Sequence, residues 1–204
     1  MAVAIGYCPY SNGFGMEEIG VATDRGRIIV DDKMQTNVPG IYAAGDVVGG
    51  MMLAYIAIAE GIVAAENAMG AGTSIDYNAV PQCIFTLPEM ACVGLNEQEA
   101  LAQGFEIEIG RFPFRANGMA AVIGEPRGMV KIIVDRKNRQ VIGAHIIGPE
   151  TTLLIAELVS AVKHKLTVED FISIIHAHPS LTEAVWEAAA DVKGQAIHIT
   201  PRKR

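Results

Sequence analysis

The sequence predicts an α+β fold in two domains, on the strength of three observations. Short apolar segments separated by glycine-rich turns, followed by one apolar helix, fill the first third of the chain. Between residues 70 and 81 the composition changes to small and polar residues that favour turns. Beyond it, apolar segments 130–134 and 141–147 flank a polar tract suited to a hairpin, which indicates antiparallel pairing. We therefore expect the end of an α/β domain at 1–75 and a domain with an antiparallel sheet at 76–204.

The individual elements follow from apolar periodicity and capping residues. In the first domain we expect strands at 2–5, 27–30 and 41–44 and a helix at about 51–69. In the second we expect strands near 82–85, 91–93, 105–112, 128–134 and 141–147. Helices are expected after the Asn96 cap, at 151–163, after Thr167 and at 180–192.

Composition excludes several classes of function. The chain has 204 residues and a net charge of -7, and its basic residues cluster only in the last four positions. Because binding to a phosphate backbone requires clustered Lys and Arg, we expect no nucleic-acid partner. The three cysteines have no CxxC spacing, so neither a disulfide framework nor a zinc site is indicated. We expect no metal and a reducing, cytoplasmic compartment.

The most apolar run, residues 47–65, has nearly the length of a membrane span. It contains Gly49, Gly50, Glu60 and Gly61 and lacks flanking basic residues, so a buried helix is the better interpretation and no membrane partner is expected. The N-terminus has no charged stretch before its apolar residues and does not resemble a signal peptide. It begins abruptly, like the middle of a strand, and we expect the chain to be a fragment of a longer protein.

The segment with the clearest chemistry is His176-Ala-His178-Pro179-Ser180-Leu-Thr-Glu183. An imidazole directly before a helix, with a carboxylate in the first turn, is how a general base is held in one tautomer. The alternative is that Glu183 caps the helix at the Ser180 amide and takes no part in chemistry. A metal pair formed by the two histidines lacks a third ligand nearby. We expect His176 to be packed or hydrogen-bonded.

A second motif runs from Thr36 to Asp46, where an apolar segment ends in Gly45. Glycine allows close backbone approach, and the Asp46 carboxylate before a helix can accept hydrogen bonds from ligand hydroxyls. The alternative is an ordinary N-cap aspartate. No GxGxxG or GxxxxGK motif occurs in the chain, so the pyrophosphate-binding part of any dinucleotide site lies elsewhere.

Together these motifs resemble two signatures of the pyridine nucleotide-disulfide oxidoreductases. Thr36 to Asp46 resembles the second flavin-binding signature, and His176 to Glu183 resembles the C-terminal active-site signature. The resemblance also covers residues 26–31, 52–54 and 85–94. Within the family, the His-x-His-Pro-Ser/Thr-x-x-Glu pattern is most similar to that of the dihydrolipoyl dehydrogenase group.

This resemblance implies a division of roles. His178 would take a proton from a dihydrolipoyl thiol, Glu183 would hold His178, and these two are the implied catalytic residues. Electrons would pass through an enzyme disulfide and FAD to NAD+. The implied cofactor-binding residues are Gly45, Asp46, Met52, Leu53, Ala54 and Pro179.

The resemblance also implies partners. Members work as homodimers, in which each His-Glu pair serves the disulfide of the other subunit. We therefore expect an α/β interface domain that dimerises, after the C-terminal end of a Rossmann-like FAD-binding domain. The implied partners are the dihydrolipoyl groups of 2-oxo acid dehydrogenase or glycine cleavage complexes.

The chain also departs from the family pattern. It has Gly6-Tyr-Cys-Pro-Tyr10 where the family has Gly-Arg-Arg-Pro-Asn, and Tyr55 where lipoamide dehydrogenases have His. The N-terminal flavin motif, the CxxxxC dithiol and the NAD-binding GxGxxG are absent. We expect the chain alone to be inactive. Two alternatives stay open: a non-catalytic dimerisation module, and another disulfide reductase of the same family.

Overall fold

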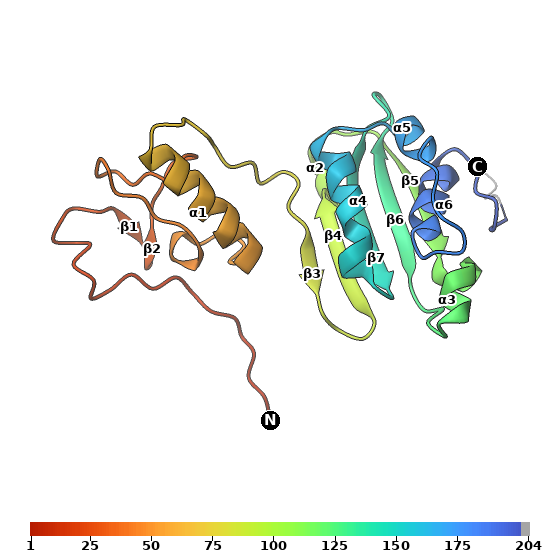
Figure 1. Cartoon of the computed structure of the whole chain (residues 1–204), viewed down its shortest axis with the longest axis horizontal. Coiled ribbons are helices and arrows are strands. Elements are labelled where there is room, and N and C mark those ends of the chain that lie inside the picture. The colour runs from red at the N-terminus through yellow and green to blue at the C-terminus, as the bar shows by residue number, and fades with distance from the viewer. Residues whose placement is uncertain (201–204) are drawn as a thin grey trace. The chain divides into compact units, whose positions relative to one another are not determined.

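The computed structural model describes residues 1–200 and divides the chain into two compact units (Figure 1). Unit 1 is Met1–Tyr77 and unit 2 is Asn78–Arg204. Each contains helices and strands, and both sheets are antiparallel, so the predicted α+β class is confirmed.

A five-stranded antiparallel sheet forms the centre of unit 2. Its strands lie in the order β3-β4-β7-β6-β5. Their bounds are Gln82–Ile84 (β3), Glu89–Gly94 (β4), Ile107–Pro113 (β5), Met129–Asp135 (β6) and Val141–Gly148 (β7). The predicted hairpin between β6 and β7 is confirmed, with a register irregularity at Ile133 and Val134.

Two long helices cover one face of this sheet (Figure 1). Helix α4 packs on β4 and β7, and helix α6 packs on β5 and β6. The helices of unit 2 are Glu97–Ala102 (α2), Gly118–Val122 (α3), Thr151–Lys163 (α4), Val168–Ile172 (α5) and Glu183–Val192 (α6), with a 3-10 turn at Phe114–Ala116 (η2). The predicted caps Asn96 and Thr167 each form a complete capping box.

The core of unit 2 lies between the sheet and these helices. Phe112 of β5 and Phe114, the first residue of η2, are fully buried there, with Leu158 of α4 and Val185 of α6. Close packing depends on Gly110 of β5, because a Cβ at that position would come within 1.9 Å of the Ala188 carbonyl oxygen of α6. The absence of a side chain at Gly110 therefore sets how near α6, which carries Glu183, lies to the sheet.

Unit 1 contains less regular structure than the sequence predicts. It consists of β1 (Thr23–Asp24), β2 (Arg27–Ile28), the 3-10 turn η1 (Asp46–Val48) and helix α1 (Ala54–Ala68). The strands predicted at 2–5 and 41–44 do not form, and that at 27–30 is shortened to two residues. A strand needs a neighbour to pair its backbone groups. Within the described chain, residues 2–5 lie exposed, and Tyr42 makes only an isolated bridge to Gln35.

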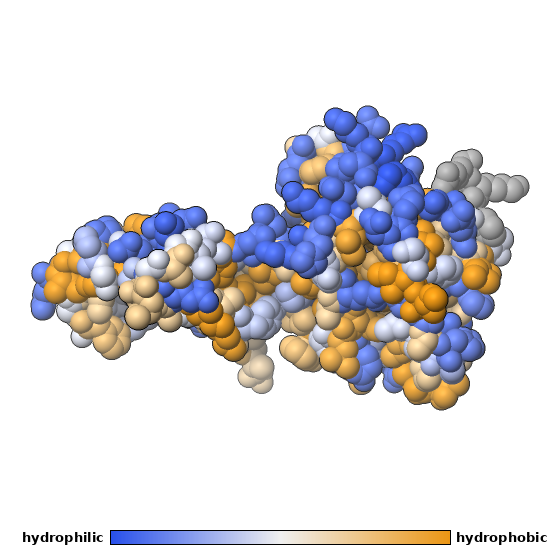
Figure 2. Space-filling view, turned by 45° about the horizontal axis from the view of Figure 1, so that its top comes forward, coloured by the Kyte–Doolittle hydropathy of each residue, from blue (hydrophilic) through white to orange (hydrophobic). Residues whose placement is uncertain are grey.

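The prediction of a buried helix at 47–65 is wrong for this chain. Helix α1 buries only Ile56 and Glu60, while Ile58 and Ile62 are exposed. The helix is mostly apolar, but few of its side chains are buried within unit 1. Apolar side chains accordingly reach the surface in both units (Figure 2). Among the residues described, no helix combines the length and apolar character needed to cross a membrane.

Candidate functional site

The His178 imidazole and the Glu183 carboxylate lie in direct contact in unit 2. The loop before α6 carries His178, and Glu183 is the first residue of that helix. Nδ1 of His178 lies 2.8 Å from Oε1 of Glu183. The His178 side chain is 73% exposed and the Glu183 side chain only 21%. The carboxylate is thus anchored against the protein, and the opposite edge of the ring, with Nε2, is left for a partner from outside.

The alternative role for Glu183, capping the helix, is realised only in part. Oε2 of Glu183 accepts a hydrogen bond from the Ser180 amide at 2.9 Å. The reciprocal contact is missing, because the Ser180 hydroxyl donates to the Ala177 carbonyl instead. Helix α6 begins at Glu183 rather than at the predicted residue 180, and its N-cap, Thr182, makes no side-chain cap. One carboxylate therefore serves both partners, each with a different oxygen.

These contacts stabilise the ionised form of Glu183. Burial by itself would raise the pKa of this carboxyl, but the Ser180 amide and the His178 ring hold the pKa below its usual value, with a smaller contribution from His198. A carboxylate that stays ionised can support a positive charge on the neighbouring imidazole. The pair is therefore suited to accept a proton at Nε2 of His178.

We predict that Glu183→Gln lowers the free energy of unfolding by about 1 kcal/mol at pH 7, the scale of one hydrogen bond to a charged group that is partly exposed. Since the folded-state pKa of Glu183 is depressed, its contribution is present above the ordinary pKa of 4.5 and disappears as the pH falls through the lower folded value. Urea unfolding between pH 3 and 7 measures this. Glu106→Gln, at an 80% exposed side chain, is the control and should show no such trend. A difference for Glu183→Gln that grows toward pH 3 would contradict the account.

Two further imidazole–carboxylate pairs surround this one. His176 is nearly buried, with Nε2 at 3.0 Å from Glu157 Oε1 and Nδ1 at 3.0 Å from the Ile174 carbonyl, so it is hydrogen-bonded as the sequence predicts. His198 Nδ1 lies 2.5 Å from Oε1 of Glu187, a buried residue of α6. Sequence reasoning missed Glu157, Glu187 and His198, because their partners lie 11 to 19 positions away along the chain.

A hollow of about 300 Å³ lies beside Glu183. From the three pairs, His176, Glu183, Glu187 and His198 line it. The other lining residues are Ile172, Ser173, Ile174, Ile175, Trp186 and Ile197. His178 does not line it. The hollow therefore borders the pair through Glu183 alone.

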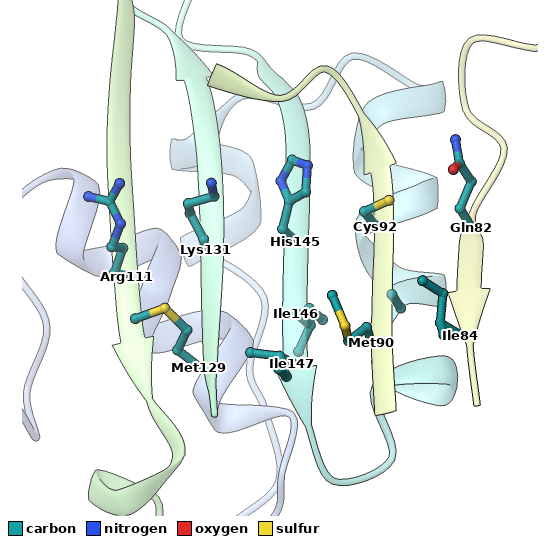
Figure 3. A pocket seen from close by; sticks show the side chains of 11 residues that line it. Gln82, Ile84, Met90, Cys92, Arg111, Met129, Lys131, His145, Ile146 and Ile147 are labelled. Atoms are coloured by element: carbon teal, nitrogen blue, oxygen red, sulfur yellow. The ribbon is translucent and has the colours of Figure 1, made fainter. Parts of the chain in front are cut away.

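The open face of the unit 2 sheet carries a second hollow, of about 390 Å³ (Figure 3). One row of side chains crosses all five strands in register: Arg111, Lys131, His145, Cys92 and Gln82. The next row on this face is apolar: Met129, Ile147, Met90 and Ile84. Glu97 bridges Arg111 and Lys131 at 2.8 and 3.0 Å. This face contains neither His178 nor Glu183.

In unit 1, the backbone at Gly45 and Asp46 forms a tight turn. Gly45 has φ 80°, and a Cβ there would lie 3.2 Å from that of Ala57 in α1. Asp46 is exposed and is the first residue of η1, while the N-cap is Gly45. The alternative of an N-cap aspartate is therefore wrong, and the Asp46 carboxylate is left for contacts outside the turn.

Three further predicted cofactor-binding residues, Met52, Leu53 and Ala54, lie just before or at the start of α1. Met52 has φ 45°, and its carbonyl accepts a hydrogen bond from the Tyr7 hydroxyl at 2.8 Å. Met52 also lines a hollow of about 470 Å³ that sequence reasoning missed, formed with Cys8, Pro9, Asp24, Arg25, Arg27, Gly49 and Gly50. Leu53 is the N-cap of α1 and Ala54 its first residue.

Pro179, also predicted to contact cofactor, lies in unit 2 beside His178, exposed and after a cis peptide bond. The structure thus groups the predicted residues into two sets, one in each unit. Among residues 1–200, no cluster of three or more His, Cys, Asp or Glu side chains is arranged to hold a metal ion.

Comparison with known proteins identifies the family to which a chain with this geometry belongs. The family model for the pyridine nucleotide-disulphide oxidoreductase dimerisation domain matches residues 80–189, and that for pyridine nucleotide-disulphide oxidoreductase matches residues 1–61. A dihydrolipoyl dehydrogenase of Haloferax volcanii is 46% identical over 202 residues, which are 98% of this chain and 42% of the relative. The mitochondrial dihydrolipoyl dehydrogenase of Sus scrofa is 44% identical, over 97% of this chain and 39% of the relative.

Solved structures agree with this assignment. LpdA from Mycobacterium tuberculosis matches with a TM-score of 0.84 and 33% identity, over 89% of this chain and 40% of that one. The HOCl-induced flavoprotein disulfide reductase RclA from Escherichia coli, as its Cu(II) complex, matches with a TM-score of 0.86 and 27% identity, over 92% of this chain and 43% of that one. The chain spans about two fifths of the length of its curated relatives. It belongs to the pyridine nucleotide-disulphide oxidoreductase family.

Proposed function

We propose that this chain supplies the acid–base and dimer-forming part of a dihydrolipoyl dehydrogenase. The observation that carries the proposal is the contact between His178 Nδ1 and Glu183 Oε1 at 2.8 Å, on a ring that is mostly exposed. Similarity to dihydrolipoyl dehydrogenases over nearly the whole chain supports the choice of substrate. The reaction is the oxidation of dihydrolipoyl groups to the cyclic disulfide, with NAD+ as the final acceptor.

In this proposal His178 is the general base. Its Nε2 accepts the proton of a dihydrolipoyl thiol, and the resulting thiolate attacks a disulfide of the enzyme that lies outside this chain. The imidazolium that forms is stabilised by Glu183, which stays ionised because of its depressed pKa. Glu183 also keeps the proton on Nδ1 before the reaction, so that the lone pair of Nε2 faces the substrate.

The proposed cofactors are FAD and NAD. Unit 1 offers features that fit a flavin: Asp46 is an exposed carboxylate that can accept hydroxyl hydrogen bonds, and Gly45 lets another group approach the backbone. Gly45, Asp46 and residues 52–54 would hold the flavin, with Pro179 as a further contact. When bound, FAD would pass the two electrons from the enzyme dithiol to NAD+.

We assign residues 1–75 to the C-terminal part of an FAD-binding domain and 76–204 to the interface domain, which we propose forms a homodimer. The match of residues 80–189 to a dimerisation domain supports this. So do apolar side chains exposed on unit 2, such as Leu153 at 69%, because such surface is often buried against another protein. The proposed partners are the dihydrolipoyl groups of 2-oxo acid dehydrogenase or glycine cleavage complexes, and the proposed location is the cytoplasm.

A chimera tests this function. Residues 1–204 would replace the matching 42% of the Haloferax volcanii relative, and the product would be assayed for bound FAD, dimerisation and dihydrolipoamide-dependent NAD+ reduction. We expect all three. A chimera that dimerises and holds FAD but does not reduce NAD+ with dihydrolipoamide would contradict the proposal and favour the non-catalytic alternative.

A second candidate is a reductase of the same family that acts on a different disulfide. The similarity to RclA, a flavoprotein disulfide reductase, favours it. The His178–Glu183 pair serves either substrate, because proton transfer to or from sulfur is common to both reactions. Rates of the same chimera with dihydrolipoamide and with NADH plus a linear disulfide such as glutathione disulfide separate the two.

A further inference from the structure

A buried carboxylate of helix α1 contacts the turn that carries Asp46. Oε2 of Glu60 accepts a hydrogen bond from the Gly45 amide, and Oε1 accepts one from the Tyr77 hydroxyl, each at 2.7 Å. Glu60 is only 3% exposed. A buried carboxylate is costly unless both oxygens are paired, so these two donors account for a carboxylate on the buried side of a mostly apolar helix.

The contacts join three segments that are distant in sequence. Gly45 ends the apolar segment before η1, Glu60 lies in the middle of α1, and Tyr77 is the last residue of unit 1. Burial and the nearby Glu60 raise the pKa of Tyr77, so its hydroxyl stays protonated and donates to the carboxylate at neutral pH. Asn67, two turns later on α1, binds the Thr73 carbonyl at 2.7 Å and secures the same final segment of unit 1.

Gly45 is the position in this arrangement that requires glycine. With φ 80° and ψ −157°, it adopts a backbone conformation that side chains disfavour, and its amide points at Glu60. The N–H that Glu60 binds belongs to the Ala44–Gly45 peptide, one residue before Asp46, so this contact restrains the path of the backbone into Asp46. The η1 turn adds a second restraint, because the Val48 amide donates to the Gly45 carbonyl at 2.9 Å.

We infer that Glu60 is a positioning residue for the turn at Gly45 and Asp46. Its carboxylate, held by the Tyr77 hydroxyl, fixes the Gly45 amide and thereby orients Asp46 toward the hydroxyls of the flavin side chain. The inference rests on the proposed function for the identity of the ligand. Glu60 itself does not reach the ligand, because both its oxygens are occupied and the residue is buried.

Amide hydrogen exchange on the 204-residue chain tests the positioning without any flavin. Glu60→Met keeps the length of the side chain and removes both acceptors, and we expect exchange at Gly45 to accelerate about tenfold or more, the scale of one lost hydrogen bond to a charged group. Glu60→Gln should restore protection to near the original level, since its amide oxygen accepts from Gly45 while its NH2 group donates to the Tyr77 oxygen. Tyr77→Phe removes only the hydrogen bond from the tyrosine hydroxyl to Glu60, and exchange at Gly45 should accelerate less.

Glu66→Met is the matched control, because Glu66 lies on the same helix and is exposed. It should leave Gly45 exchange unchanged. Unchanged exchange at Gly45 in both Glu60→Met and Tyr77→Phe would overturn the inference. Equal acceleration throughout α1 and at Gly45 would also overturn it, because that result indicates general loosening of unit 1.

The flavin-loaded chimera then separates positioning from the proposed function. We expect Glu60→Met to raise the FAD dissociation constant about tenfold or more and Glu60→Gln to rescue it. Altered Gly45 exchange with unaltered FAD affinity would overturn the positioning role. Absence of FAD in the unsubstituted chimera would instead count against the proposed function, and the exchange results would stand on their own.

Discussion

Replacing His178 with Gln is expected to lower dihydrolipoamide-dependent NAD+ reduction by about 10²- to 10⁴-fold, the usual contribution of a general base. The glutamine side chain still fits beside Glu183 but cannot take a proton from the thiol. Because the His178 side chain is 73% exposed, the free energy of unfolding should change by less than about 0.5 kcal/mol. The measurement is the rate of NAD+ reduction by the chimera and its His178→Gln variant, from pH 5 to 9.

The control for this result is His164→Gln. His164 lies exposed at the C-terminal end of α4 and belongs to none of the three imidazole–carboxylate pairs. Its substitution should leave the rate within about twofold, as expected for a surface change that affects neither substrate nor fold. If His178→Gln retained the original rate and pH profile, the role assigned to His178 would be wrong.

The largest expected effect on stability comes from Gly110→Ala. The added Cβ would meet the Ala188 carbonyl oxygen at 1.9 Å and the Val192 amide nitrogen at 3.0 Å, both in the backbone of α6. Backbone atoms cannot turn aside as a flexible side chain can, so α6 has to move away from β5. We expect the free energy of unfolding to fall by about 3 kcal/mol, the upper part of the range for overpacking.

The same substitution should act on the site, since Glu183 is the first residue of α6. We expect weaker contact between Glu183 and His178, visible as a changed imidazole chemical shift for His178. Gly118→Ala is the control: Gly118 begins α3, its Cβ would meet nothing within 4 Å, and Ala there should be neutral or stabilising by up to about 1 kcal/mol. Urea unfolding measures the free energy of unfolding of both variants. Equal values for Gly110→Ala and Gly118→Ala would contradict the packing argument.

The parts of unit 2 that could be predicted are those set by local sequence. Helix α4 begins and ends where its apolar spacing and composition indicate, at Thr151 and Lys163, and the cap at Asn96 is readable from Glu99 three positions later. The β6–β7 hairpin follows from two apolar segments around a polar tract. Each of these signals lies within a few residues of the structure that it specifies.

Contacts between distant positions could not be predicted in this way. The pairing of Glu60 with Gly45 and Tyr77 spans 15 and 17 residues, and that of Glu187 with His198 spans 11. In the sequence Glu60 is only an argument against a membrane span, although a carboxylate within the apolar stretch of a helix indicates a buried partner. The strand predicted at 2–5 failed for a related reason, because strand formation depends on a neighbour rather than on the segment itself.

The tautomer of His178 in the neutral ring tests the central claim most directly. Long-range 15N–1H correlation spectra of the isotope-labelled 204-residue chain, recorded at a pH where the ring is neutral, distinguish the two ring nitrogens. We predict a proton on Nδ1, facing Glu183, and a bare Nε2 facing solvent. A proton on Nε2, or a tautomer mixture that Glu183→Gln leaves unchanged, would contradict the account.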